Sequence, residues 1–192
     1  MKKFLWSVFG VGALLVGAQA VYSAVDSQQF TVVVPKRVSI VAPVADQIKT
    51  LTIAELAAAE LTGVDDVAFT AQQWAVKGNV RNGVSVNFVA APFLNITHFP
   101  TATINQNARL TVARIGATTT GPATWSLTSP SGTSSSNYAA VAPASPNALV
   151  AYSSNRVGQT DFAVTVEFLA ADLNAVVEGD YVTTVVGTLT EN

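Results

Sequence analysis

The sequence predicts an all-β protein, an antiparallel β-sandwich made of two sheets. The chain after residue 20 holds 26 Val, 21 Thr and 6 Ile, and these β-branched side chains fit a pleated strand better than a helix. Several segments alternate apolar and polar residues, which is typical of strands with one buried face. Helical segments do not alternate with these strands, and this pattern argues against a parallel sheet.

The composition excludes several classes of function. The chain has 192 residues, of which 49% are hydrophobic and 11% are charged, so it can bury the core of one folded domain. It has no Cys and one His, which removes disulfides, thiolate catalysis and Cys zinc sites. The 10 basic and 12 acidic residues are scattered, so no nucleic-acid partner is expected. We therefore expect a non-enzymatic protein with no cofactor and no metal.

The N-terminus has the pattern of a secretory signal peptide. Two lysines follow the initiating Met, an apolar run extends to Val16, and Ala18-Gln19-Ala20 forms a typical cleavage site. The run is shorter than the roughly 20 residues that cross a bilayer, so we expect no membrane span after its removal. We predict a signal peptide over 1–20 and a single domain over 21–192, with cleavage after Ser23 as the alternative. The protein is then secreted, either extracellular or at the cell surface, or retained in a periplasm.

Two segments that end at prolines open the predicted domain. Phe30, Val32 and Val34 alternate with other residues before Pro35, and a similar alternation covers 38–42 before the next proline. A proline bounds or bends a strand because it lacks an amide donor. We predict two strands here, or one kinked strand.

One segment favours a helix. Thr52 and Glu55 have the spacing of a capping box, in which the hydroxyl and the carboxylate satisfy opposite backbone amides. Strong helix formers continue to Leu61, and Gly63 follows. We predict a short helix around 53–61 that bridges strands or covers an end of the sandwich.

The clearest turn signal is Asn82-Gly83, between two alternating segments. Both residue types tolerate a positive φ, which a tight hairpin requires. The sequence therefore predicts a hairpin over about 72–90. Alternation predicts further strands over 110–115, 124–128, 149–152, 162–168 and 181–189.

The segment 128–147 is rich in Ser, Pro and Gly, which predicts an exposed loop. Trp125 precedes this segment and Tyr138 lies inside it, and the two aromatic rings are candidates for a ligand-binding platform that stacks on sugars. Aromatic residues of β-proteins more often belong to the core, and Trp74, inside an alternating segment, is interpreted in that way. Trp125 and Tyr138 support a second hypothesis, a carbohydrate-binding or adhesive module whose partner is a glycan.

Residues that carry catalysis or bind metals are sparse. His98 is the only candidate imidazole base, and no Gly-X-Ser-X-Gly motif accompanies it. Asp65 and Asp66 are adjacent but lack the spacing of a calcium loop, so we interpret them as a solvated turn. Asn95 begins an Asn-X-Thr sequence that accepts a glycan only in a cell that glycosylates such sites.

Two stretches resemble a known class of exported proteins. The run 173–190, with its Gly-Asp-Tyr followed by alternating Val and Thr, resembles the closing strands of exported immunoglobulin-like and fimbrial sandwiches. The segment 30–43, a valine-rich strand with two prolines, is similar to the first strand of such secreted bacterial surface proteins. The resemblance implies an immunoglobulin-like or pilin-like sandwich that serves as a structural subunit. The absence of Cys departs from the disulfide-containing fimbrial subunits.

These observations lead to one functional prediction. We expect a structural subunit of a bacterial surface or extracellular assembly, such as a fibre, a pilus-like structure or a layer. Residues 21–34 form an N-terminal extension in which Phe30, Val32 and Val34 could complete the sheet of a neighbouring subunit. The partners would be other copies of the chain or other surface proteins. The alternative for this extension is an ordinary first strand that pairs within its own domain.

Overall fold

The computed structural model describes residues 28–63, 65–98, 105–139 and 145–192. The predicted signal peptide, residues 1–20, lies outside these ranges. The chain divides after Val34, and the part from Pro35 to Asn192 forms one compact unit. In the described residues this unit holds β1 (Val38–Val41), α1 (Ile53–Thr62), β2 (Val67–Ala68), β3 (Gln72–Gly78), β4 (Val84–Ala90), β5 (Leu94–Asn95), β6 (Asn107–Thr120), β7 (Trp125–Leu127), β8 (Thr133–Ser135), β9 (Ala148–Ser154), β10 (Gly158–Leu169), β11 (Tyr181–Val182) and β12 (Val185–Glu191).

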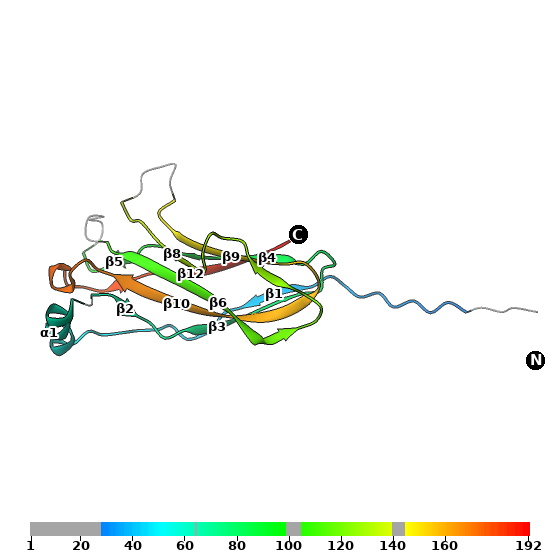
Figure 1. Cartoon of the computed structure of the whole chain (residues 1–192), viewed down its shortest axis with the longest axis horizontal. Helices are drawn as coiled ribbons and strands as arrows, with labels where there is room; N and C mark the ends of the chain where they lie inside the picture. The colour runs from blue at the N-terminus through cyan, green and yellow to red at the C-terminus, as the bar shows by residue number, and fades with distance from the viewer. Residues whose placement is uncertain (1–27, 64, 99–104, 140–144) are drawn as a thin grey trace, which may run out of the picture. The chain divides into compact units, whose positions relative to one another are not determined.

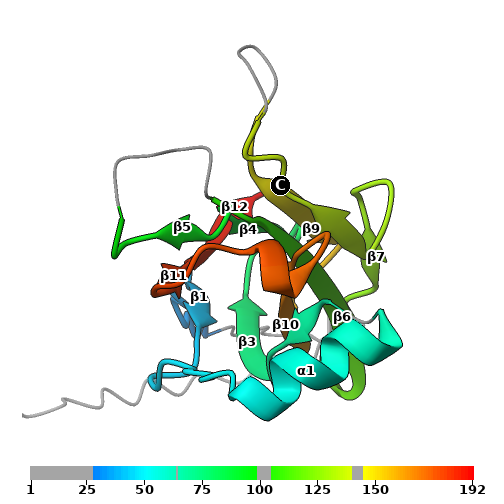
Figure 2. The same ribbon diagram turned by 90° about the vertical axis from the view of Figure 1, so that its left-hand side faces the viewer.

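The strands form two main antiparallel sheets packed face to face, which confirms the predicted all-β sandwich (Figure 1). The first sheet has the order β1-β3-β10-β6-β8, and β2 pairs with β10. The second sheet has the order β12-β4-β9-β7, and β11 and β5 form a separate two-stranded pair. Figure 2 views the strands nearly end-on, with β1 and β12 on one side of the sandwich and β7 on the other.

The core lies between the sheets and is built by alternation. Every second residue of β4 and β9 is buried, as a strand with one covered face requires. Phe162 of β10 lies at the centre of an aromatic cluster, with ring centroids 5.3 Å from Phe88, 5.7 Å from Trp125 and 4.8 Å from Tyr152. These edge-on and tilted contacts join both sheets, because Phe88, Trp125 and Tyr152 belong to the second one.

The helix α1 covers one end of the sandwich, as the sequence predicts. The capping box is present: the Glu55 amide donates to the Thr52 hydroxyl, and the Thr52 amide donates to the Glu55 carboxylate. Gly63 ends the helix with a φ of 64°, a left-handed conformation that suits glycine. Ala59 of the helix is buried in a second apolar cluster with Phe93 and Phe168. The predicted helix around 53–61 is confirmed.

The predicted hairpin over 72–90 is wrong in its pairing, although both strands exist. β3 pairs with β1 and β10 in the first sheet, whereas β4 pairs with β12 and β9 in the second. The turn at Asn82-Gly83 therefore passes from one sheet to the other, and the Gly83 amide donates to the Val80 carbonyl. A Cβ added to Gly78 would lie 2.7 Å from Val84 Cγ1, so the strands face each other across the core. Alternation marks the buried face of each strand, but it does not distinguish a hairpin within one sheet from a connection between two sheets.

Two other segments differ from the predictions. Residues 28–37 form no strand, so the first of the two predicted strands is absent and only β1 is present. The predicted exposed loop over 128–147 contains β8, which pairs with β6, and Ser136 is buried behind it. The Ser136 hydroxyl accepts from the Ala108 amide, and this hydrogen bond lets a serine-rich segment join the sheet.

Candidate assembly site

The apolar side chains of residues 28–34 are exposed to solvent. The exposed fractions are 83% for Phe30, 86% for Val32, 85% for Val33 and 73% for Val34. The segment is not assigned to a strand. The interpretation as an ordinary first strand of its own domain is therefore wrong for this structure. The predicted role of Phe30, Val32 and Val34 as an assembly strand stays a prediction.

The chain enters the compact unit beside the end of β3. Asn79, directly after that strand, donates from Nδ2 to the Pro35 carbonyl at 2.8 Å and from its amide to the Arg37 carbonyl at 3.0 Å. Lys36 forms an ion pair with Glu191 near the end of β12. These contacts fix the point from which residues 28–34 leave the unit.

The first edge of the sandwich is formed by β1 and β12, the outermost strands of the two sheets. Gly187 brings them close, since a Cβ there would lie 2.6 Å from Ile40 Cδ1 and 2.7 Å from Trp74 Cζ3. The inward-facing Val185 and Leu189 are only partly buried, whereas the matching residues of β4 are fully buried. This edge, called here the open edge, is therefore incompletely covered.

A groove of about 360 Å³ continues the open edge beyond the end of β1 and the first residue of β12. β1 ends at Val41, which pairs with Ala75, so the first residues of β3 lack a β1 neighbour. Residues 42–47 continue without strand structure, and Gln47 Nε2 donates to the Thr70 carbonyl at 2.8 Å. The lining residues are Ala42, Pro43, Ala45, Asp46, Gln47, Phe69, Thr70, Gln72, Trp74, Phe93, Val164, Val166, Tyr181, Val182, Thr183, Thr184 and Val185.

Sequence reasoning missed the groove because five separate stretches of chain form it. Its one local signal is Pro43, which ends the alternation of β1 while β3 continues beyond it. The other wall, residues 181–185, contains β11, a break at residues 183–184 and the first residue of β12, whereas the sequence predicts one uninterrupted strand there. No pattern in either stretch shows that the two lie opposite each other.

The second edge, formed by β7 and β8, is closed by the chain itself. The chain passes from β7 in the second sheet directly to β8 in the first. The Thr128 amide donates to the Ala151 carbonyl at 2.8 Å, and the Tyr152 hydroxyl donates to the Val112 carbonyl at 2.9 Å. The last of these hydrogen bonds is buried and joins the two sheets. This edge is called here the closed edge.

The structure does not bring Trp125 and Tyr138 together as a ligand-binding platform. Trp125 is 5% exposed, and its ring packs edge-on against Phe162, so the predicted contact with a sugar is not available to it. Tyr138 is exposed, and its amide donates to the Asn107 side chain at 2.9 Å. Burial of Trp125 corrects the prediction and favours the core interpretation.

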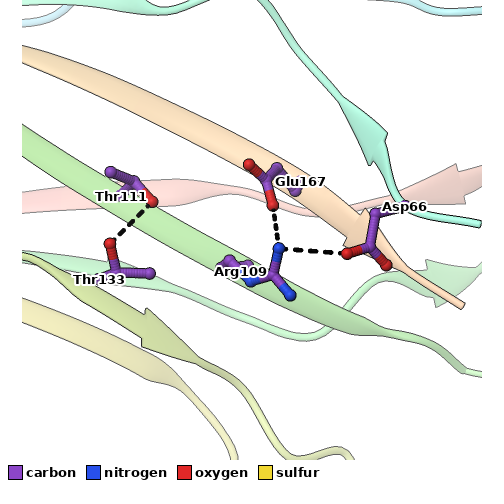
Figure 3. A network of polar contacts seen from close by, with 5 residues as sticks. All are labelled: Asp66, Arg109, Thr111, Thr133 and Glu167. Atoms are coloured by element: carbon purple, nitrogen blue, oxygen red, sulfur yellow. Dashed lines mark hydrogen bonds and ion pairs between the residues drawn. The ribbon is translucent and has the colours of Figure 1, made fainter. Parts of the chain in front are cut away.

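The acidic turn at Asp65 and Asp66 is structural. The Asp65 carboxylate accepts from the Leu173 amide at 3.1 Å, and Asp66 pairs with Arg109 at 3.1 Å. Arg109 also binds Glu167 of β10 at 2.5 Å, as Figure 3 shows, and this hydrogen bond raises the pKa of the guanidinium. The cluster ties the turn to the outer face of the first sheet.

His98 is exposed at the end of a polar corner that Asn95 organises. Asn95 is 1% exposed, and its Oδ1 accepts from the amides of Thr97 at 3.1 Å and His98 at 2.9 Å. Its Nδ2 donates to the Glu178 carbonyl at 3.1 Å. Asn95 therefore fixes the backbone beside β11, where one wall of the groove begins.

Comparisons with protein-family models, curated proteins and solved structures find no match to this chain. Within the described ranges, no helix has the length and apolar character needed to span a membrane. In the same ranges, no three His, Asp or Glu side chains gather into a group that could hold a metal ion. The exposed segment and the groove are therefore the features from which a function can be argued.

Proposed function

We propose that the protein is an exported, non-enzymatic structural subunit of a bacterial cell-surface or extracellular assembly. Copies of the chain join by β-strand addition, in which residues 28–34 of one copy complete a sheet of another. The observation that carries this proposal is the exposure of alternating apolar side chains at Phe30, Val32 and Val34, ahead of the compact unit. The pattern of a signal peptide over 1–20 supports export.

The energetics favour covering this segment. Burying a Phe or Val side chain contributes about 1.5–3 kcal/mol relative to leaving it exposed, so three such residues represent a substantial unused stabilisation. An extended segment added to a sheet edge gains main-chain hydrogen bonds, while pockets for alternate side chains supply specificity. Both contributions are absent while the segment stays exposed.

A matched pair of substitutions tests the proposal. Val32 and Val33 are adjacent, identical and almost equally exposed, at 86% and 85%, so their replacement affects an isolated copy equally. A strand points successive side chains to opposite faces. In the chain that begins at Val21, we expect Val32→Asp to abolish the filaments or layers seen by electron microscopy, and Val33→Asp to retain them. Equal behaviour of the two variants, or no assembly of the parent protein, contradicts the proposal.

Deletion of residues 21–34 gives an independent measurement. We expect the shortened chain to remain folded by circular dichroism and to sediment as a monomer, because the compact unit begins at Pro35. A shortened chain that still assembles, or that loses its fold, contradicts donation of this segment.

A further inference from the structure

We propose that the groove at the open edge is the acceptor, and that it takes residues 28–34 of a second copy of this chain. The inference rests on the proposed function and extends it by assigning the binding surface. The donated segment would lie between residues 42–47 and residues 181–185, the two walls of the groove.

The backbone of one wall is paired on one side only. Tyr181 and Val182 pair with β5, and Val185 pairs with Ala90 of β4. In the described part of the chain, β12 is the last strand of its sheet, so no strand pairs with its other side. Such an edge presents unpaired amides and carbonyls to an incoming strand. The groove meets this edge at Val185, the first residue of β12, and continues along residues 181–184.

The side chains that line the groove suit an apolar strand. Phe93 and Val164 are each 3% exposed and belong to the two core clusters, whereas Phe69, Trp74 and Tyr181 are only partly buried. These aromatic rings would be covered further by an inserted segment. Side chains on one face of a strand repeat about every 7 Å, and the donated segment offers three in sequence, Phe30, Val32 and Val34.

Within the compact unit, the attachment point of the donor at Pro35 and the groove lie at opposite ends of β3. Asn79, which binds the Pro35 and Arg37 carbonyls, follows the last residue of β3, while Gln72 and Trp74 near its first residue line the groove. A seven-residue strand spans roughly 20 Å. Two different surfaces that meet head to tail form an open chain of subunits unless the rotation closes a ring. The geometry therefore points to a linear fibre.

Engineered cysteines test this acceptor, because the chain has no Cys of its own. The first cysteine replaces the exposed Val33 of the donor, on the face opposite to the inserted side chains. The second replaces Val182, Thr184 or Val186, three exposed positions along the open edge, in three separate variants. The control pairs Val33→Cys with Ser126→Cys, an exposed position on β7, the opposite edge of the same sheet.

The variants are assembled, oxidised and analysed on non-reducing gels, with electron microscopy of the same samples. We expect at least one open-edge variant to give a ladder of covalent oligomers at more than tenfold the yield of the control, since a disulfide requires Cβ atoms about 3.5–4.5 Å apart. If filaments cross-link equally well through Ser126→Cys, or through none of the three open-edge positions, the groove is not the acceptor. Either result leaves the proposed function intact. A disulfide confined to single chains overturns insertion into a second copy. Absence of filaments from the parent chain overturns both.

Discussion

At the closed edge the chain crosses from β7 to β8 and covers the space between the sheets with its own backbone. At the open edge β1 and β12 come from opposite ends of the compact unit in sequence and approach each other closely around Ile40 and Gly187. The closed edge is joined by hydrogen bonds, including one from the Tyr152 hydroxyl to the Val112 carbonyl. The open edge has a groove instead. Continuity of the chain, more than composition, therefore decides which edge of this sandwich is covered.

The largest contrast is expected between the two tryptophans. Trp125 at the closed edge is 5% exposed, while Trp74 at the open edge is partly buried and contacts Phe88 at 5.6 Å. We expect Trp125→Ala to lower the free energy of unfolding by about 3–5 kcal/mol, and Trp74→Ala to lower it by about 2 kcal/mol. Urea denaturation at a protein concentration that prevents assembly measures both. Equal losses would show that the open edge is as well covered as the closed one.

A smaller effect is expected where the two edge strands touch. A methyl group at Gly187 would press on Ile40 and Trp74, so Gly187→Ala should separate β1 from β12 and lower the free energy of unfolding by about 1–3 kcal/mol. Gly116→Ala is the matched control, since a Cβ there meets nothing within 4 Å. Thermal denaturation of both variants checks this. An unchanged free energy of unfolding in Gly187→Ala would mean that β1 and β12 can move apart without loss of stability.

The tyrosine hydroxyls give the next contrast. Tyr152→Phe removes a buried hydrogen bond and should cost about 1 kcal/mol, whereas Tyr181→Phe removes an exposed one to the Val177 carbonyl and should cost less. Burial raises the pKa of Tyr152 in the folded protein. The contribution of its neutral hydroxyl to the free energy of unfolding is therefore present below the pKa of the unfolded chain, and it is lost as pH rises through the pKa of the folded protein. The free energy of unfolding should therefore fall less steeply with rising alkaline pH in Tyr152→Phe than in Tyr181→Phe. The reverse order would contradict the assignment of a raised pKa to Tyr152.

The smallest effect is expected at the helix-covered end, which serves as a reference for both edges. Hydrogen bonds from Thr52 hold the pKa of Glu55 below its usual value, so this contribution is present above the unfolded pKa and disappears as pH falls through the folded pKa. In Glu55→Gln, the free energy of unfolding should fall slightly less as pH is lowered through the acidic range, and filament assembly should be unchanged. Urea denaturation at several acidic pH values measures the first effect. A change in filament yield would connect this end to the open edge.

Local signals predicted local structure well. Thr52, Glu55 and Gly63 define the helix without any tertiary information, because each acts through backbone groups within four residues. Alternation likewise located β4, β9 and β10. Asn82-Gly83 misled because a turn fixes the direction of the chain but not the sheet that the next strand joins. The short strand β8 was missed because Thr133, Ser134 and Ser135 show no alternation of apolar and polar residues.

The candidate site was predicted only in part. Phe30, Val32 and Val34 stand out in sequence because their alternation is contiguous. The groove that we propose as their acceptor is lined both by Trp74 and by residues more than 100 positions later, such as Val185. Likewise, the burial of Trp125 depends on Phe162, which comes from the other sheet. Long-range packing of this kind leaves no mark in one sequence.

The burial of Asn95 determines which host can produce the native protein. Cells with a glycosylating secretory pathway modify Asn-X-Thr sequences, and Asn95-Ile96-Thr97 is one. Nδ2 donates to the Glu178 carbonyl, and a sugar attached to it would have no room beside a side chain that is 1% exposed. Glycosylated chains would therefore be blocked before they fold. A host that leaves asparagine unmodified is required.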